Sequence, residues 1–275
     1  MILDKRTTFS SYITRLLSTG RVVFSGADAR QALDVSQGAL LDAAERQQHK
    51  KQLVSPRRGF YVIVPPQYLS WGAPPPPWYI DDLMRHEGRP YYVGLLKAAE
   101  LHGATHQAVM EFQIVTDKRL PEIRVGRSAI TFYYRKDMAA AGKGIEERKT
   151  DTGRMKISSV ELTMLDLVRY PHAAGGLDNI ATIISDLGDH IDAGKLASLS
   201  PAYERSIKQR LGYLLDRFGQ PERAEALYAA LPHGAALPWI ELERSQAVDP
   251  ELSPGKKERN ERWHVIVRRP PESDE

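Results

Sequence analysis

The sequence predicts an α+β protein made of two domains. Three observations support this. The first 65 residues combine short capped helices with a hairpin, which is typical of a winged helix-turn-helix domain. A proline-rich segment follows. The remainder mixes strand-like hairpins with helical segments, which predicts a mixed α+β domain with a small antiparallel sheet and a helical second half.

The composition is that of a globular protein. The chain has 275 residues, of which 42% are hydrophobic and 27% are charged, so collagen-like, mucin-like and wholly disordered classes are excluded. It contains no cysteine, which excludes disulfide scaffolds, thiolate zinc sites, iron–sulfur clusters and a cysteine nucleophile. The first residues carry Asp4 and polar side chains where a signal peptide needs an apolar run, and no apolar run is long enough to span a bilayer. We therefore expect a cytoplasmic protein that does not associate with membranes.

The domain boundary is expected in the segment PPQYLSWGAPPPPW, which holds six of the 18 prolines. Proline fixes φ and lacks an N–H donor, so this stretch favours an extended, semi-rigid connection over a helix or a central strand. We expect a winged helix-turn-helix domain over 1–65, a proline-rich strap over 66–78, an α+β domain over 79–269 and a disordered tail over 270–275.

The first domain contains three segments with helical spacing of apolar residues. Ser25 and Ser36 precede two of these segments, and a serine in that place accepts a hydrogen bond from a backbone N–H of the first turn. We expect helices over 7–18, 25–33 and 36–50, with a tight turn at Asp34-Val35 between the last two. The stretches QLVS (52–55) and FYVIV (60–64) alternate as strands around Pro56-Arg57-Arg58-Gly59, which is a turn sequence. This order predicts a winged helix.

Charge is concentrated in this first domain, where residues 1–65 hold ten basic and five acidic side chains. In a winged helix the second helix of the helix-turn-helix enters the major groove, and the hairpin lies against the DNA backbone or in the minor groove. We expect Gln37 to recognise a base and the cations to neutralise phosphates, although Asp42 and Glu45 on the same helix would repel them. The alternative is a winged helix that only docks proteins. The expected DNA-binding residues are Ser36, Gln37, Arg46, His49, Lys50, Lys51, Arg57 and Arg58.

The second domain has a less regular pattern. We expect helices over 80–86, 91–102, 160–170, 176–187, 202–218 and 221–230. We expect strands over 112–116, 122–125, 129–135, within 145–157, and over 239–244 and 263–269, with the last two returning to the main sheet.

Four segments together resemble the AbiE-type antitoxins, the AbiEi-like transcriptional regulators of type IV toxin–antitoxin systems that are also associated with abortive phage infection. The segments are RGFYVIVP (58–65), YYVGLLKAAELHG (91–103), EIRVGRSAITFYYRKD (122–137) and SSVELTMLDLVRYP (158–171). The resemblance implies repression of the system's own promoter by the N-terminal domain, through repeats in double-stranded DNA. It also implies that the C-terminal domain counters a nucleotidyltransferase-like toxin, with direct contact left open. The residues themselves point only to DNA binding.

Motifs of enzyme chemistry are incomplete. Asp151-Thr152-Gly153 spells the aspartic-protease triplet among charged neighbours that indicate a solvated turn. His102 and His106 have the spacing of a zinc helix, but Gly103 ends that helix. Asp137 with Glu147 and Lys149 resembles a nuclease metal cluster and equally fits a charged strand edge. We expect no catalytic site, no metal and no cofactor.

Two alternatives remain open, a metal-dependent nuclease targeted by a winged helix and a repressor that responds to a ligand. For the antitoxin activity the sequence offers two candidate basic surfaces. One is the stretch with Lys256, Lys257, Arg259, Arg262, Arg268 and Arg269 beside Trp263, and the other is Arg127 with Arg135-Lys136.

Overall fold

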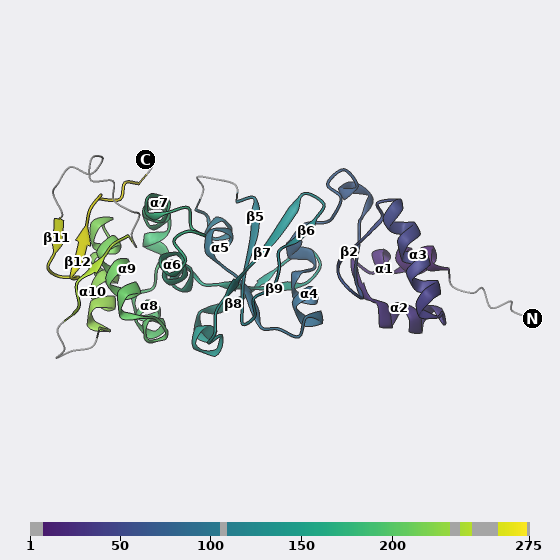
Figure 1. The fold of residues 1–275 in the computed structure, drawn as a ribbon, viewed down its shortest axis with the longest axis horizontal. Helices are drawn as coiled ribbons and strands as arrows, with labels where there is room; N and C mark the ends of the chain where they lie inside the picture. Colours follow the sequence, from purple (N-terminus) through teal and green to yellow (C-terminus); the bar gives the residue numbers. More distant parts are fainter. Residues whose placement is uncertain (1–7, 105–108, 232–236, 244–257, 274–275) are drawn as a thin grey trace, which may run out of the picture. The chain divides into compact units, whose positions relative to one another are not determined.

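The computed structural model describes residues 8–104, 109–231, 237–243 and 258–273 (Figure 1). The chain forms two compact units that are each discontinuous in sequence. The first comprises 1–92, 110–136 and 147–156, and the second comprises 93–109, 137–146 and 157–275. The first unit thus extends past the proline-rich strap. In the described ranges no helix combines the length and the apolar character that crossing a bilayer requires.

The first unit begins with three helices and three strands. These are α1 (Phe9–Ser18), β1 (Val23–Ser25), α2 (Gly26–Leu33), α3 (Gln37–His49), β2 (Leu53–Arg57) and β3 (Phe60–Ile63). The strands form a sheet of order β1-β3-β2 with antiparallel pairs. A single core joins helices to sheet, with Tyr12, Phe24 and Tyr61 stacked or edge-on against each other. The expected helices and hairpin of this segment are therefore present.

The strap is packed onto the strands that follow it. It contains two short 3-10 turns, η1 (Pro66–Tyr68) and η2 (Pro76–Trp78). The Trp78 Nε1–H donates to Asp151 Oδ2 at 2.8 Å, and Thr152 Oγ1 donates to the Trp78 carbonyl at 2.7 Å. A Cβ on Gly126 would lie 2.3 Å from the Trp71 carbonyl oxygen, so a side chain at that position would break the close contact of the two backbones. The aromatic rings and glycines thus hold the strap against the same unit.

The main sheet has six strands in the order β6-β7-β5-β4-β9-β8. They are β4 (Tyr91–Val93), β5 (Glu111–Thr116), β6 (Ile123–Val125), β7 (Ser128–Tyr134), β8 (Ile145–Lys149) and β9 (Arg154–Ser158). The expectation of an antiparallel sheet is wrong, because β5 pairs with β7 and β4 with β9 in parallel. The hairpin β6–β7 adds to β5 through its second strand, so that β6 lies at the edge. Helix α4 (Ile80–His86) precedes this sheet.

The expected helix over 91–102 is also partly wrong. Residues Tyr91–Val93 form strand β4, and α5 begins only at Leu95 and ends at His102. Gly94 separates the two in an extended conformation, and Leu95 has a positive φ of 56°. Aromatic and β-branched residues that are buried on both faces favour a strand, and this burial outweighs the helical spacing of the apolar residues.

The second unit is mainly helical, with helices α6 (Val160–Arg169), α7 (Leu177–Leu187), α8 (Ala193–Leu199), α9 (Arg205–Arg217) and α10 (Pro221–Ala229). Ser159 caps α6, as its position in the sequence predicts. Helix α8 is not among the expected elements, since its seven residues are too few for a clear periodicity. Glu161 is buried and accepts hydrogen bonds from Ser159 Oγ and the Asp192 N–H, which ties α6 to the start of α8.

The last strands form a sheet of their own instead of returning to the main sheet. Its order is β10-β12-β11, with β10 (Ile240–Glu241), β11 (Glu258–Asn260) and β12 (Val265–Val267). Strand β11 is not among the expected elements. The strand expected over 239–244 corresponds to β10, and its expected last residue, 244, lies outside the described residues. Trp263 explains why this sheet stays with the helices, because its indole is fully buried and packs flat against Gly212 of α9.

Candidate nucleic-acid interface

The turn between α2 and α3 is built by two capping serines and one left-handed residue. Ser25 Oγ accepts from the Asp28 N–H at 3.0 Å, and Ser36 Oγ accepts from the Ala39 N–H at 3.2 Å. Between the helices Asp34 has φ 51° and ψ 52°, a conformation that aspartate tolerates better than most residues. The two helices are thus held by a tight turn, as the sequence predicts (Figure 1).

Helix α3 buries one face and exposes the other. Leu40, Ala44 and Gln47 are buried, and Gln47 Nε2 donates to Ser10 Oγ of α1 at 3.3 Å. The N-terminal side chains that we expect to contact bases, Ser36 and Gln37, are exposed. So are Asp42 and Glu45, which confirms that the outward face of the helix carries acids among its cations.

Four basic side chains gather where α3 ends. Arg46, His49, Lys50 and Lys51 are all exposed. Lys51 has a φ of 58° and donates its N–H to the Gln48 carbonyl, so it closes the helix in the left-handed conformation. Within the described ranges only His49 has an acidic neighbour, with Nε2 3.7 Å from Glu45 Oε1. The cations of this cluster therefore face solvent with little internal compensation.

The two arginines at the hairpin tip differ in their surroundings. Arg58 is exposed, and its carbonyl lies 3.1 Å from His86 Nε2. Arg57 is only 21% exposed in its side chain and lies 2.9 Å from Glu87 Oε1 through Nε. Its Nη2 donates to the Pro121 carbonyl at 2.9 Å, and its guanidinium lies over the Phe132 ring. Arg57 thus contacts the strands and helix of its own unit, whereas Arg58 remains accessible.

This fastening of the hairpin could not be found from the sequence. His86 is the last residue of α4, and Glu87 follows it at a distance of 30 residues from Arg57 along the chain. Neither residue belongs to a motif. The Phe60 ring lies 5.4 Å from the His86 ring, which completes the contact. In the sequence, only the apolar side chain of Phe60 and the acidic side chain of Glu87 could have indicated that the hairpin is attached here.

The candidate basic surfaces of the C-terminal half are largely neutralised. Arg262 pairs with Asp216 and Glu225, Arg268 with Glu241, and Arg269 with Asp178. Arg127 lies over the Trp71 ring, and Arg135 is buried. Lys256 and Lys257 lie outside the described residues. These side chains serve packing or ion pairing more than they form a free basic surface.

The incomplete enzyme motifs do not assemble. Asp151 lies in the turn of the β8–β9 hairpin, where its carboxylate accepts from Trp78. His102 Nε2 lies 2.6 Å from the Ser158 carbonyl, and His106 is outside the described ranges. A search of the described residues gives no group of three or more His, Asp or Glu side chains placed to hold a metal ion.

Comparison with known proteins finds a family match within the chain. Residues 92–217 match the family model of the AbiEi antitoxin C-terminal domain, which confirms the resemblance seen in the sequence. The family supports an antitoxin role in a toxin–antitoxin system.

The chain is also similar in structure to the RV2827C protein from Mycobacterium tuberculosis, known from a crystal structure. The TM-score is 0.68 at 20% sequence identity, over 94% of this chain and 90% of that one. At this identity the likeness establishes a common fold and nothing of function. A comparison with the curated proteins gave no match.

Proposed function

We propose that this protein is the cytoplasmic antitoxin of a type IV, AbiE-like toxin–antitoxin system and that it also represses its own promoter. The antitoxin part is supported by the family match over residues 92–217. The DNA-binding part is supported chiefly by one observation, the exposed cation cluster at the end of α3 (Arg46, His49, Lys50 and Lys51).

The N-terminal elements support a winged helix. Their order of helix, strand, helix, helix and hairpin, with sheet order β1-β3-β2, supports the proposal that α3 is the recognition helix. The start of α3 is uncharged, with Gln37, Gly38 and Ala39 exposed, which suits contacts with base edges. Its end carries the cation cluster, which suits contacts with phosphates.

The wing contributes to DNA binding through Arg58 in this proposal. Arg57 forms an ion pair and a hydrogen bond within its own unit, so binding a phosphate would require it to give up Glu87 and the Pro121 carbonyl. We therefore assign Arg57 to the attachment of the wing and the remaining seven expected residues to the DNA interface.

The antitoxin activity belongs to the second part of the chain in this proposal, and its counterpart is a nucleotidyltransferase-like toxin. The three arginines that flank β12, Arg262, Arg268 and Arg269, are paired with acids, which speaks against a broad basic surface that would mask the toxin. Neutralisation through a small number of specific contacts, or through an effect on the toxin's product, fits these surroundings better.

Promoter binding is tested by fluorescence anisotropy with the labelled promoter fragment and a scrambled fragment of equal length. We expect tighter binding of the promoter, and a log–log salt dependence with a slope of about −0.9 for each phosphate neutralised. Equal affinity for the two fragments would refute specific repression.

Antitoxicity is tested by co-expressing the proposed cognate nucleotidyltransferase-like toxin with the full-length chain. We expect growth to be rescued by the wild type and by variants of the α3 cation cluster alike, because the cluster serves DNA binding. Loss of rescue in soluble α3 variants would show that the two activities are not separate.

A further inference from the structure

A pocket lies between α1 and α2, both labelled in Figure 1, and it belongs entirely to the first unit. Its volume is about 530 Å³, within the range of roughly 300–1,000 Å³ that is typical of small-molecule sites. The residues that line this α1–α2 pocket include Tyr12, Arg15, Leu16, Arg21, Asp28 and Gln31. Its size permits a small ligand, and its lining decides which kind.

The buried part of the α1–α2 pocket is apolar except for one hydroxyl. Tyr12 and Leu16 are 4% and 6% exposed, and the Tyr12 ring packs edge-on against Phe24 with 5.5 Å between the ring centroids. The Tyr12 hydroxyl has no hydrogen-bond partner among the residues that the structure describes. A ligand in the pocket therefore meets apolar surface and one hydroxyl that is held in place by the core.

Two guanidinium groups line the same pocket. Arg15 and Arg21 are exposed, and the Arg15 guanidinium carbon lies 5.6 Å from the centroid of the Tyr12 ring. Neither arginine side chain forms an ion pair or a hydrogen bond with any part of the chain that the structure describes. A guanidinium binds a phosphate or a carboxylate through two parallel hydrogen bonds, so this pair of arginines favours a ligand with an anionic group.

Helix α2 contributes an acid and an amide to the pocket. Asp28 and Gln31 are exposed, and neither side chain has a hydrogen bond or an ion pair in the described ranges. Asp28 does not pair with the two arginines, although all three charges act on the same hydroxyl. Burial and then the charge of Asp28 raise the pKa of Tyr12, whereas the charges of the two arginines lower it. The unpaired carboxylate favours a ligand that also carries hydrogen-bond donors, such as hydroxyl groups.

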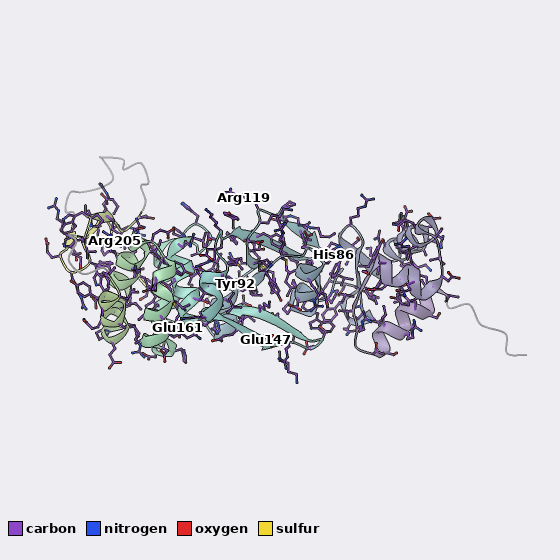
Figure 2. All side chains as sticks on the ribbon, turned by 90° about the horizontal axis from the view of Figure 1, so that it is seen from below. His86, Tyr92, Arg119, Glu147, Glu161 and Arg205 are labelled. Atoms are coloured by element: carbon purple, nitrogen blue, oxygen red, sulfur yellow. The ribbon has the colours of Figure 1, made fainter. Side chains whose placement is uncertain are left out.

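Opposite charges elsewhere in the chain are commonly paired. Glu161, labelled in Figure 2, is buried and its Oε2 lies 3.4 Å from Lys195 Nζ. Arg57 Nε lies 2.9 Å from Glu87 Oε1. In the α1–α2 pocket the acid and the arginines instead keep their hydrogen-bonding groups available to another molecule, and a ligand that contacts both kinds of group fits this arrangement.

We propose that the α1–α2 pocket binds a small phosphorylated sugar, either free or as part of a mononucleotide. Arg15 and Arg21 hold the phosphate, and Asp28 accepts hydrogen bonds from the sugar hydroxyls, as acids do for ribose in dinucleotide-binding proteins. Phosphate fits two guanidinium groups better than a carboxylate does, because it offers three strong acceptor oxygens instead of two.

The acid in the pocket favours this ligand over a longer polyanion. Asp28 would repel a second phosphate group, so a DNA backbone or a nucleoside triphosphate fits the lining less well. The pocket contains no residue of the α3 cation cluster. Ligand binding here is therefore independent of promoter binding, and either can occur without the other.

The test is isothermal titration calorimetry on the full chain, in a buffer free of phosphate and at constant ionic strength. We expect ribose 5-phosphate and AMP to bind the wild type several-fold more tightly than inorganic phosphate, because inorganic phosphate reaches only the arginines. Arg21→Ala should weaken the binding of both by at least about tenfold, as expected for a lost charge-assisted hydrogen bond. The Arg21 side chain forms no hydrogen bond or ion pair within the described ranges, so this variant should fold like the wild type.

Two matched variants show whether the pocket itself is responsible. Arg30→Ala removes an exposed arginine of α2 that does not line the pocket, and it should bind like the wild type. The wild type should prefer AMP over its 2′-deoxy form, and Asp28→Ala should abolish this preference while it keeps the binding of inorganic phosphate. Circular dichroism verifies that each variant is folded. The variant lacking Arg46, Lys50 and Lys51 should keep the binding of ribose 5-phosphate, which separates this site from promoter binding.

The source of the phosphate follows from the two organic ligands. Tighter binding of AMP than of ribose 5-phosphate indicates a nucleotide, and equal or weaker binding of AMP indicates a free sugar phosphate. The site is rejected if neither ligand binds, if Arg21→Ala and Arg15→Ala both bind like the wild type, or if Arg30→Ala weakens binding as much as Arg21→Ala. Inorganic phosphate that binds as tightly as ribose 5-phosphate would also overturn the proposal, as would binding of glutamate without binding of either phosphorylated ligand.

Discussion

The end of α3 and the C-terminal strands are both rich in basic residues, yet their charges have different surroundings. The basic side chains at the end of α3 are exposed, and within the part of the chain that the structure describes only His49 has an acidic neighbour, Glu45. The arginines near β12 meet acids that come from 27 to 91 residues earlier in the chain, at Glu241 and Asp178. Local charge along the sequence is similar, and only tertiary structure separates a free basic surface from a neutralised one.

The difference has a physical consequence for function. A free cation releases counterions when it neutralises a phosphate, and it therefore contributes to affinity for nucleic acid. A paired arginine must first give up its carboxylate, which cancels much of that gain. In the proposed function, the comparison therefore favours α3 as the DNA interface and a structural role for the paired C-terminal arginines.

The largest expected effect is at the end of α3. Replacing Arg46, Lys50 and Lys51 by alanine should lower affinity for the promoter by about 10²-fold or more at moderate salt and make the log–log salt slope shallower by up to about 2.7, because three phosphate contacts are lost. Anisotropy titrations over a range of salt concentrations measure both. Replacing Lys136, Lys143 and Lys149 removes the same charge elsewhere, and an equal loss in that control would mean that only net charge matters.

The two wing arginines sharpen the comparison within one hairpin. Arg57→Ala should destabilise the fold by roughly 1–3 kcal/mol, because it leaves Glu87 and a carbonyl without a half-buried partner. Arg58→Ala should leave stability unchanged and weaken DNA binding several-fold. Urea unfolding and anisotropy separate the effects. If Arg57→Ala instead reduced the affinity for DNA without loss of stability, Arg57 would release Glu87 and the Pro121 carbonyl when the protein binds DNA.

Arg262 provides the corresponding test among the C-terminal strands. It bridges Asp216 and Glu225 and lies over the rings of Tyr228 and Trp263. Arg262→Ala should lower the free energy of unfolding by about 1 kcal/mol and leave promoter affinity as it is. A clear loss of DNA binding in this variant, with stability retained, would contradict the assignment of these arginines to structure.

The smallest expected effect is on the stability of the protein at acidic pH. The pKa of Asp178 is lowered because, although burial opposes this, its carboxylate accepts from Arg269 and from the Glu272 N–H. A carboxyl whose pKa is lower when folded stabilises the protein above its unfolded pKa and loses that contribution as pH falls through the folded value. Stability measured between pH 5 and 2 should therefore decline less steeply in Asp178→Asn. An identical decline would show that the pair contributes nothing.

The sequence predicts local structure well where the signals are local. Ser25 and Ser36 cap their helices as expected, and the turn at Asp34 lies between them. The errors arise where burial overrides periodicity, as in Tyr91–Val93, or where strand partners are chosen by tertiary packing, as for β5 and β7. Composition and spacing carry no information on which strand lies next to which.

The sequence predicts which residues of the candidate site are exposed better than it predicts what each of them contacts. The exposed end of α3 follows from helical spacing, because Leu40, Ala44 and Gln47 define the buried face. The role of Arg57 did not follow, since its partners lie 30 and 64 residues further along the chain. Lys208 shows the same limit, because a lysine in a helical segment is ordinarily solvated and only the structure shows that it is buried.

The interrupted course of the first unit along the chain bears on synthesis at the ribosome. Its last segment ends at residue 156, so the unit cannot complete its contacts until that residue has left the exit tunnel. Pairings between distant segments form late and slowly, and incomplete sheets expose strand edges meanwhile. A nascent chain interrupted before this point would lack both a finished first unit and residues 157–217 of the segment that matches the antitoxin family. Under the proposed function, the two activities would therefore become available together, in one maturation step.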